Sequence, residues 1–507
     1  MPRLKNAPRF AAALPALLLA ALIPAALIPA ALIPAGCTVG PDFQSPEAPS
    51  VTHYTAGEDP TATAFAEGSA QRFRTDTELP ADWWRLFDCP KLDDAVRRGL
   101  AANPTIAAAE ANLQQARDSL RGGEGIFYPQ VNGNLGATRE RPSPDATPIK
   151  LQEGIFNLFT LSTTVSYTLD IFGGEHRTVE GLSAAADYQQ NVARAASLTL
   201  ASNIVNAVIA GAAYDAEIQA TEEIIERQKA QVQLATVQAD AGTATYASML
   251  SLQSQLEATE ATLPPLRKQL VQSQDLLAVL VGQMPADWQP PHISFADLSL
   301  PQALPVSLPV ALVRQRPDIL QAGAQLHEAS AGIGVATAAM LPSVTLDGSF
   351  GVSDVATTGL FTAGSKVWSV AAGVTQPIFH GGTLWFQRKA AIDAYQASAA
   401  SYRQTVLTAF QQVADTLRGL EHDADALAVD ERALKTAQDA LNLVQANYRA
   451  GLTTYSDLLI ADTLYSEARI ADIQAKAVRY QDTVALFVAL GGGWWNKPDK
   501  VAANLTP

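Results

Sequence analysis

The sequence repeats one pattern in its two halves. Each half contains a run in which polar and apolar residues alternate, followed by a glycine pair and a long stretch without proline; the runs are 160–174 and 369–382. The motifs beside the runs correspond as well: 103–106 matches 316–319, and 241–246 matches 450–455. The offsets are 213, about 208 and 209 residues, so the register holds through each half. Two copies of one unit account for the 507 residues and predict a molecule with internal pseudo-symmetry.

Four segments of the chain alternate polar and apolar residues over about 10 positions each. In the second segment, Leu161, Val165 and Tyr167 alternate with Thr164 and Ser166. A period of two places these sets on opposite faces of a β-strand. The polar faces are rich in Ser, Thr, Asn and Gly and poor in charge, and aromatic residues cluster near the segment ends. This pattern is typical of transmembrane β-barrel strands that surround a wet interior.

The four segments fall into two expected hairpins, at 128–171 and 342–378. A soluble β-sandwich is the alternative, but four strands are too few to form the core of so long a chain. Four strands also cannot close a barrel, and an open sheet edge in lipid is prohibitively costly. The barrel must therefore be shared between copies. Two copies would give eight strands, whose side chains nearly fill the interior, whereas three would give twelve and leave a lumen, which we favour.

Each strand pair is followed by a long expected helix. Residues 175–240 and 386–449 contain no proline and are rich in Ala, Gln, Glu and Leu. A helix of this length spans roughly 100 Å. Coiled-coil spacing appears in the second helix, at Leu434, Ala437, Leu441, Val444 and Tyr448. Each helix then meets an Ala-Gly turn and continues into a second helix, through about 282 and 490. Three chains with two helical hairpins each would form a twelve-helix tube.

The first 36 residues have the features of a secretory signal. Three basic residues are followed by an apolar stretch with Ala-Leu-Ile-Pro-Ala three times, and then by Ala-Gly before Cys37. A membrane-spanning helix is the alternative, which the repeated prolines disfavour. A cysteine after two small residues resembles a bacterial lipoprotein cleavage site, although Pro34 stands where leucine is usual. This resemblance implies that Cys37 becomes the N-terminus and carries N-acyl and S-diacylglycerol groups.

The composition disfavours several classes of function. A net charge of −15 argues against nucleic acid as a partner, because phosphate binding needs a basic face. With only two cysteines and six histidines, a disulfide framework or a Cys/His metal site is not expected. Cys89, without a partner once Cys37 is lipidated, is expected to be a buried or half-buried thiol. Because no nucleophile with a base and no acid/base pair stands out, we do not expect an enzyme.

Taken in order, the motifs resemble the outer-membrane factors of bacterial efflux pumps, in the lipoprotein (NodT-like) branch related to TolC. The matching motifs cover the whole mature chain, at 37–43, 83–87, 103–104, 316–319, 339–342, 376–382, 448–451 and 490–494. The resemblance implies an α+β membrane protein that forms a homotrimer, with a twelve-stranded outer-membrane β-barrel continuous with a long periplasmic α-helical barrel. It also implies an equatorial collar built from residues before 90, around 283–310 and after 490.

The implied activity is passive export of drugs or other small molecules across the outer membrane, with no cofactor besides the lipid on Cys37. An inner-membrane transporter of the resistance-nodulation-division (RND) class would supply the energy, and a periplasmic adaptor would join the two. One alternative is the conduit of a type I protein secretion system, built on the same tube. A periplasmic adaptor lipoprotein is a second alternative, but an adaptor carries one helical hairpin, and this sequence predicts two.

The expected organisation follows from these elements. We predict a signal peptide (1–36), an anchor and equatorial segment (37–90), a first repeat (91–282, with helical hairpin 175–282), an equatorial linker (283–303), a second repeat (304–490, with helical hairpin 383–490) and an equatorial tail (491–507).

The candidate functional residues lie at the tips of the helical hairpins. Gly242 and Gly451 mark the turns, where the family closes its pore and docks its adaptor. Asp457 and Asp462 follow the second turn, and three copies of an acid around a narrow ring would select cations and favour dilation by repulsion. The alternative is an acid stabilised by the helix dipole. Arg449 could pair with an acid across the tip or be a charge at a helix C-terminus.

Overall fold

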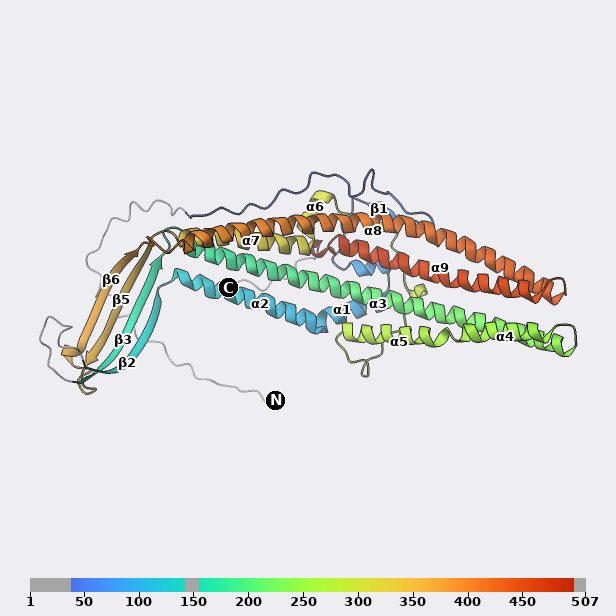
Figure 1. Cartoon of the computed structure of the whole chain (residues 1–507), viewed down its shortest axis with the longest axis horizontal. Helices are drawn as coiled ribbons and strands as arrows, with labels where there is room; N and C mark the ends of the chain where they lie inside the picture. Colours follow the sequence, from blue (N-terminus) through green and yellow to red (C-terminus); the bar gives the residue numbers. More distant parts are fainter. Residues whose placement is uncertain (1–37, 142–154, 497–507) are drawn as a thin grey trace.

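The computed structural model describes residues 38–141 and 155–496. The expected signal peptide, the expected lipidation site Cys37 and the last eleven residues of the expected tail lie outside the described residues. The molecule is elongated, with a β-sheet at one end and long helices that run away from it to the opposite end (Figure 1).

Four antiparallel strands form the sheet, in the order β2-β3-β5-β6. Their bounds are Gln130–Glu140, Phe156–Leu169, Ser343–Asp354 and Lys366–Thr375. Each half of the chain contributes one hairpin, and β3 joins the hairpins by pairing with β5, with Tyr167 opposite Leu346. The edges of the sheet are β2 and β6, which have no further partner among the described residues.

Two helices of 67 residues leave the sheet, α3 (Gly174–Asp240) and α8 (Thr383–Arg449). Gly173 and Gly382 at their N-caps have positive φ, which glycine adopts without steric cost. The shorter helices α2 (Pro104–Glu124) and α7 (Pro317–Ala338) accompany the halves nearest the sheet. The coiled-coil spacing predicted a buried seam on the second long helix, and this prediction is confirmed. Leu441 and Tyr448 are buried, and Leu434, Ala437 and Val444 pack against the same hydrophobic cluster.

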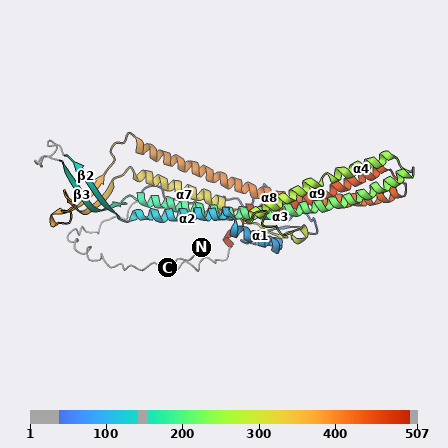
Figure 2. The same ribbon diagram turned by 90° about the horizontal axis from the view of Figure 1, so that it is seen from below.

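The return helices differ between the repeats. In the second repeat, α9 (Tyr455–Ala489) is continuous, as expected. In the first repeat, the single helix expected through about 282 is instead divided into α4 (Tyr246–Glu260) and α5 (Leu263–Leu280). Pro264 and Pro265 explain the break, because proline has no N–H and is tolerated only in the first turn of a helix. At the tip, α4 lies beside α3 and α9 lies beside α8 (Figure 2).

Short elements pack around the middle of the long helices and form the main hydrophobic core. They are β1 (Arg72–Arg74), η1 (Trp83–Phe87), α1 (Pro90–Ala102), η4 (Phe295–Asp297), β4 (Ala303–Pro305) and α6 (Pro309–Gln315). The last described element is η6 (Trp494–Asn496), where Trp494 Nε1 donates to the Gln315 carbonyl at 2.7 Å. Trp83 and Phe87 are fully buried in the main core against Phe487 of α9. Cys89 is a buried free thiol in the same core, which confirms the expectation for this residue.

Candidate functional site

The end of the molecule opposite the sheet contains the two turns that connect α3 to α4 and α8 to α9 (Figure 1). In the first, Gly242 has φ +77 and its N–H donates to the Ala239 carbonyl, while the N–H of Thr243 donates to the Gln238 carbonyl. The second turn repeats this arrangement around Gly451, at φ +74. Both are Schellman turns, which satisfy the last carbonyls of a helix and need a residue with positive φ. Gly242 and Gly451 therefore have a structural reason to be glycine.

Asp457 caps the start of α9. Its Oδ2 accepts hydrogen bonds from the Thr454 N–H at 2.9 Å, from the Thr454 hydroxyl at 2.6 Å and from the Thr453 hydroxyl at 2.7 Å. The Thr454 Oγ1 in turn accepts from the Asp457 N–H, which completes a capping box. These hydrogen bonds, first of all the one from Thr454, lower the pKa of Asp457 to about 2. Asp457 is thus an exposed and ionised acid that also holds the turn.

Asp462 lies inside the chain, whereas an acid that lines a ring around a pore would have to be accessible. It is 1% exposed, and its carboxylate accepts hydrogen bonds from Gln228 Nε2 at 2.6 Å and Gln231 Nε2 at 3.4 Å, both on α3. The reason is helical periodicity. Asp462 lies five residues after Asp457, about 140° around the helix, on the same stripe as Leu458.

Burial raises the pKa of Asp462, although the two amide donors and the charge of Arg227 oppose that rise. The Arg227 guanidinium lies 4.2 Å from the ring centroid of Tyr465, one turn of α9 from Asp462. The Oε1 of Gln228 is buried and has no hydrogen-bond partner within the described part of the chain. This buried polar group therefore connects α9 of the second repeat to α3 of the first.

A second connection lies closer to the turns. The Tyr448 hydroxyl on α8 donates a hydrogen bond of 2.9 Å to Gln238 Oε1 on α3. Arg449 follows as the last residue of α8 and is exposed. We did not predict Gln228, Gln231 and Gln238 from the sequence. Their partners are more than 200 residues away, and a glutamine on a helix gives no signal of its own.

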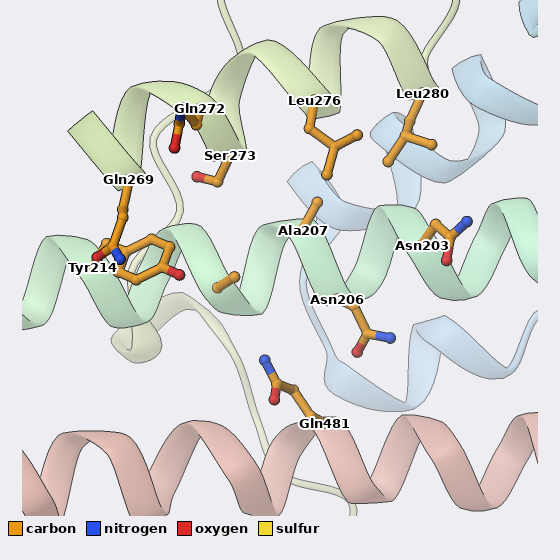
Figure 3. A pocket seen from close by; sticks show the side chains of 11 residues that line it. Asn203, Asn206, Ala207, Tyr214, Gln269, Gln272, Ser273, Leu276, Leu280 and Gln481 are labelled. Carbon is orange, nitrogen blue, oxygen red and sulfur yellow. The ribbon is translucent and has the colours of Figure 1, made fainter. Parts of the chain in front are cut away.

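A polar hollow lies further along the helices, beside the central core (Figure 3). It has a volume of about 580 Å³ and is lined by α3, α5 and α9. Its polar side chains are Asn203, Asn206, Tyr214, Gln269, Gln272, Ser273 and Gln481. Asn206 points toward α9, from which Gln481 points back. No carboxylate, histidine or cysteine lines this hollow; its polar groups are side-chain amides and the hydroxyls of Tyr214 and Ser273, which offer hydrogen bonds.

Comparison with known proteins gives a consistent result. The family model for outer membrane efflux proteins matches residues 95–283 and 308–492. The pyoverdine export outer membrane protein OpmQ of Pseudomonas aeruginosa is 27% identical over 425 residues, which cover 83% of this chain and 89% of OpmQ. The toluene efflux pump outer membrane protein TtgC of Pseudomonas putida is 27% identical over 468 residues, which cover 91% and 94% of the two chains.

A solved structure has the same architecture. The outer-membrane channel OprN superposes with a TM-score of 0.82 at 26% identity, over 90% of this chain and all of OprN. The matched residues include both hairpin turns and both long helices, and the family model covers well over half of the sequence. The chain belongs to the outer membrane efflux protein family.

Proposed function

We propose that this protein is the outer-membrane channel of a tripartite efflux pump, through which drugs or other small molecules pass passively out of the periplasm. One observation carries the proposal most directly. The chain has a four-stranded sheet whose edges β2 and β6 lack partners among the described residues, and this sheet is continuous with helices of 67 residues. A sheet in lipid must close, and a helix of that length reaches roughly 100 Å beyond it.

Three copies close this sheet in the proposed assembly, which has a twelve-stranded barrel above a twelve-helix tube. The polar face of the sheet carries hydroxyls and amides, and some of them form hydrogen bonds between strands, Ser349 with Ser369 and Asn134 with Thr164. Such a polar face suits a wet lumen. The other face carries apolar side chains that this chain leaves exposed, such as Leu135 and Val370. Hydrocarbon is the environment that stabilises such a face.

The tip is the proposed gate. In the closed state, Asp462 and its two glutamines hold α9 against α3, and the Tyr448–Gln238 hydrogen bond holds α8 against α3. Opening separates these helices, so it must break both connections. Asp457 is exposed at the start of α9, where three copies would concentrate negative charge around the entrance. Arg449, on the opposite side of the same turn, is a candidate partner for that charge.

The proposed partners follow from this geometry. A periplasmic adaptor docks at the turns that contain Gly242 and Gly451, and joins the channel to an inner-membrane RND transporter. The export of pyoverdine and toluene, named for two relatives, favours small molecules as the substrate class. Cys37, next to the first described residue, is the proposed attachment point for N-acyl and S-diacylglycerol groups that insert into the outer membrane.

Deletion of the gene tests the function. The deletion strain should become more susceptible to several classes of small drugs and accumulate more of a fluorescent substrate, and expression of the wild-type protein should reverse both effects. A tip variant with Gly451→Pro, expressed at the wild-type level, should fail to restore efflux. If susceptibility is unchanged and a secreted protein disappears from the medium instead, the channel serves type I secretion and the proposal is wrong.

A further inference from the structure

Residues 38–43, which follow the proposed attachment point Cys37, have no role in the channel proposed above, yet they occupy a well-defined site. Thr38 lies against Gly173, at the turn where β3 passes into α3. The next residue, Val39, donates its N–H to the Phe172 carbonyl at 2.9 Å. The start of the described chain is therefore held at the base of the sheet.

A buried cation on α3 binds the same segment. Arg177 is 4% exposed, and its guanidinium donates to the carbonyls of Val39 (3.2 Å) and Gly40 (3.5 Å) and to Asp42 Oδ1 (2.6 Å). It also donates to Glu180 Oε2 at 2.7 Å. One side chain thus binds two backbone carbonyls and one carboxylate of the segment. A buried arginine with its donors satisfied in this way has a fixed position.

The second half of the site comes from α7. Phe43 stacks on His327, with the ring centroids 4.3 Å apart and the ring planes 14° from parallel. His327 Nε2 lies 2.8 Å from Glu180 Oε1, so Glu180 connects the histidine on α7 with Arg177 on α3. The segment therefore contacts both α3 and α7, through Arg177 and His327.

Shape adds to this recognition. Gly40 has φ +92, and a Cβ at this position would lie 2.5 Å from Gly334 Cα on α7. A Cβ on Gly334 would in turn lie 2.6 Å from Arg177 Cγ. The segment and α7 approach each other backbone to backbone, and glycine on both sides makes this approach possible.

The second repeat lacks such a site. At the corresponding glycine turn, the position equivalent to Arg177 is Trp385. Ile378 and Phe379 beside that turn are 93% and 87% exposed, so no segment of the described chain covers them. The site is thus specific to the first repeat and does not follow from the repeated architecture.

We propose that residues 38–43 are a docking peptide, and that Arg177, Glu180, His327 and Gly334 form its receptor, which braces α3 against α7 at the base of the sheet. The peptide connects the two repeats where the long helices meet the barrel. Its contacts, rather than the lipid on Cys37, fix the N-terminal segment to the body of the protein.

A matched pair of glycine variants tests the docking. Gly40→Ala introduces both a strained φ and the clash with Gly334, whereas Gly57→Ala introduces the same strain at φ +93 with no atom within 4 Å. Hydrogen exchange of the purified detergent-solubilised protein should be at least tenfold faster across 38–44 and at the start of α3 in Gly40→Ala. Gly57→Ala should exchange there as the wild type does. Wild-type exchange in Gly40→Ala would overturn the proposal.

Two further variants separate peptide from lipid and guard against misfolding of Gly40→Ala. Asp42→Asn removes the ion pair and should accelerate exchange across 38–44, whereas Glu47→Gln, also exposed, should not. Cys37→Ser removes the lipid site and should leave the protection of 38–44 unchanged. If Cys37→Ser alone releases the segment, the lipid holds it and the proposal is wrong. If the segment is released but α7 keeps its protection, the proposed brace is wrong.

Discussion

Replacement of Asp462 by alanine should weaken the connection between the two helical hairpins. Gln228 and Gln231 are 2% and 8% exposed, and both would lose the acceptor of their Nε2 donors. A buried donor left unsatisfied costs about 1–3 kcal/mol. Relief from the burial of a carboxylate offsets part of that cost. We therefore expect a net loss of about 2 kcal/mol for local opening, which is roughly a 30-fold change in the equilibrium.

Hydrogen exchange of α9 measures this change directly. Amides of 458–470 should exchange roughly 30-fold faster in Asp462→Ala than in the wild type, since exchange reports the free energy of local opening. Asp462→Asn should be much milder, because the new amide can donate to the Gln228 Oε1 that now has no partner among the described residues. Glu467→Ala, on an exposed position of α9, is the control. Equal exchange in Asp462→Ala and Glu467→Ala would refute the reasoning.

Three further predictions concern pH, the turns and the central core. Burial and the neighbouring Asp423 raise the pKa of Asp482 to about 7. The folded state then binds the proton more tightly than the unfolded state, so thermal stability should fall as the pH rises from about 4 to about 7. In melting curves, Asp482→Asn should flatten this pH dependence, whereas Asp425→Asn should not. Gly451→Ala should destabilise the second turn by about 1 kcal/mol, since its φ is +74 and an added Cβ meets no atom within 4 Å; Gly451→Asn should cost less, as measured by exchange at the turn. Trp83→Ala should cost about 3–5 kcal/mol through the cavity it leaves, visible as a lower unfolding temperature, whereas Arg72→Ala nearby on the exposed side of β1 should have little effect.

Local patterns in the sequence predicted much of the architecture. The period-two segments became β2, β3, β5 and β6, because alternation fixes which face of a strand each side chain occupies. The proline-free stretches became α3 and α8, and the coiled-coil spacing identified the buried seam. The expectation of one continuous helix through about 282 was wrong, because Pro264 and Pro265 interrupt the helix between α4 and α5.

One candidate residue, Asp457, has a role that a local pattern predicts, whereas the contacts of Asp462 and Arg177 have no local signal. Thr454-x-x-Asp457 is a capping box by its spacing alone, so the structural role of Asp457 could be inferred from four residues. Asp462 offered no such signal, because its donors are 234 and 231 residues away along the chain. The same holds for Arg177, whose partner Asp42 is 135 residues distant. Side-chain networks of this kind depend on tertiary packing.

The number of copies in the membrane-extracted particle tests the central claim most directly. Native mass spectrometry of the protein released from outer-membrane fractions should give the mass of three chains, which is the number that closes four-stranded sheets into a barrel with an open lumen. A monomer would leave β2 and β6 unpaired in lipid, and a dimer of eight strands would leave no passage for a drug-sized molecule. Either mass would contradict the account.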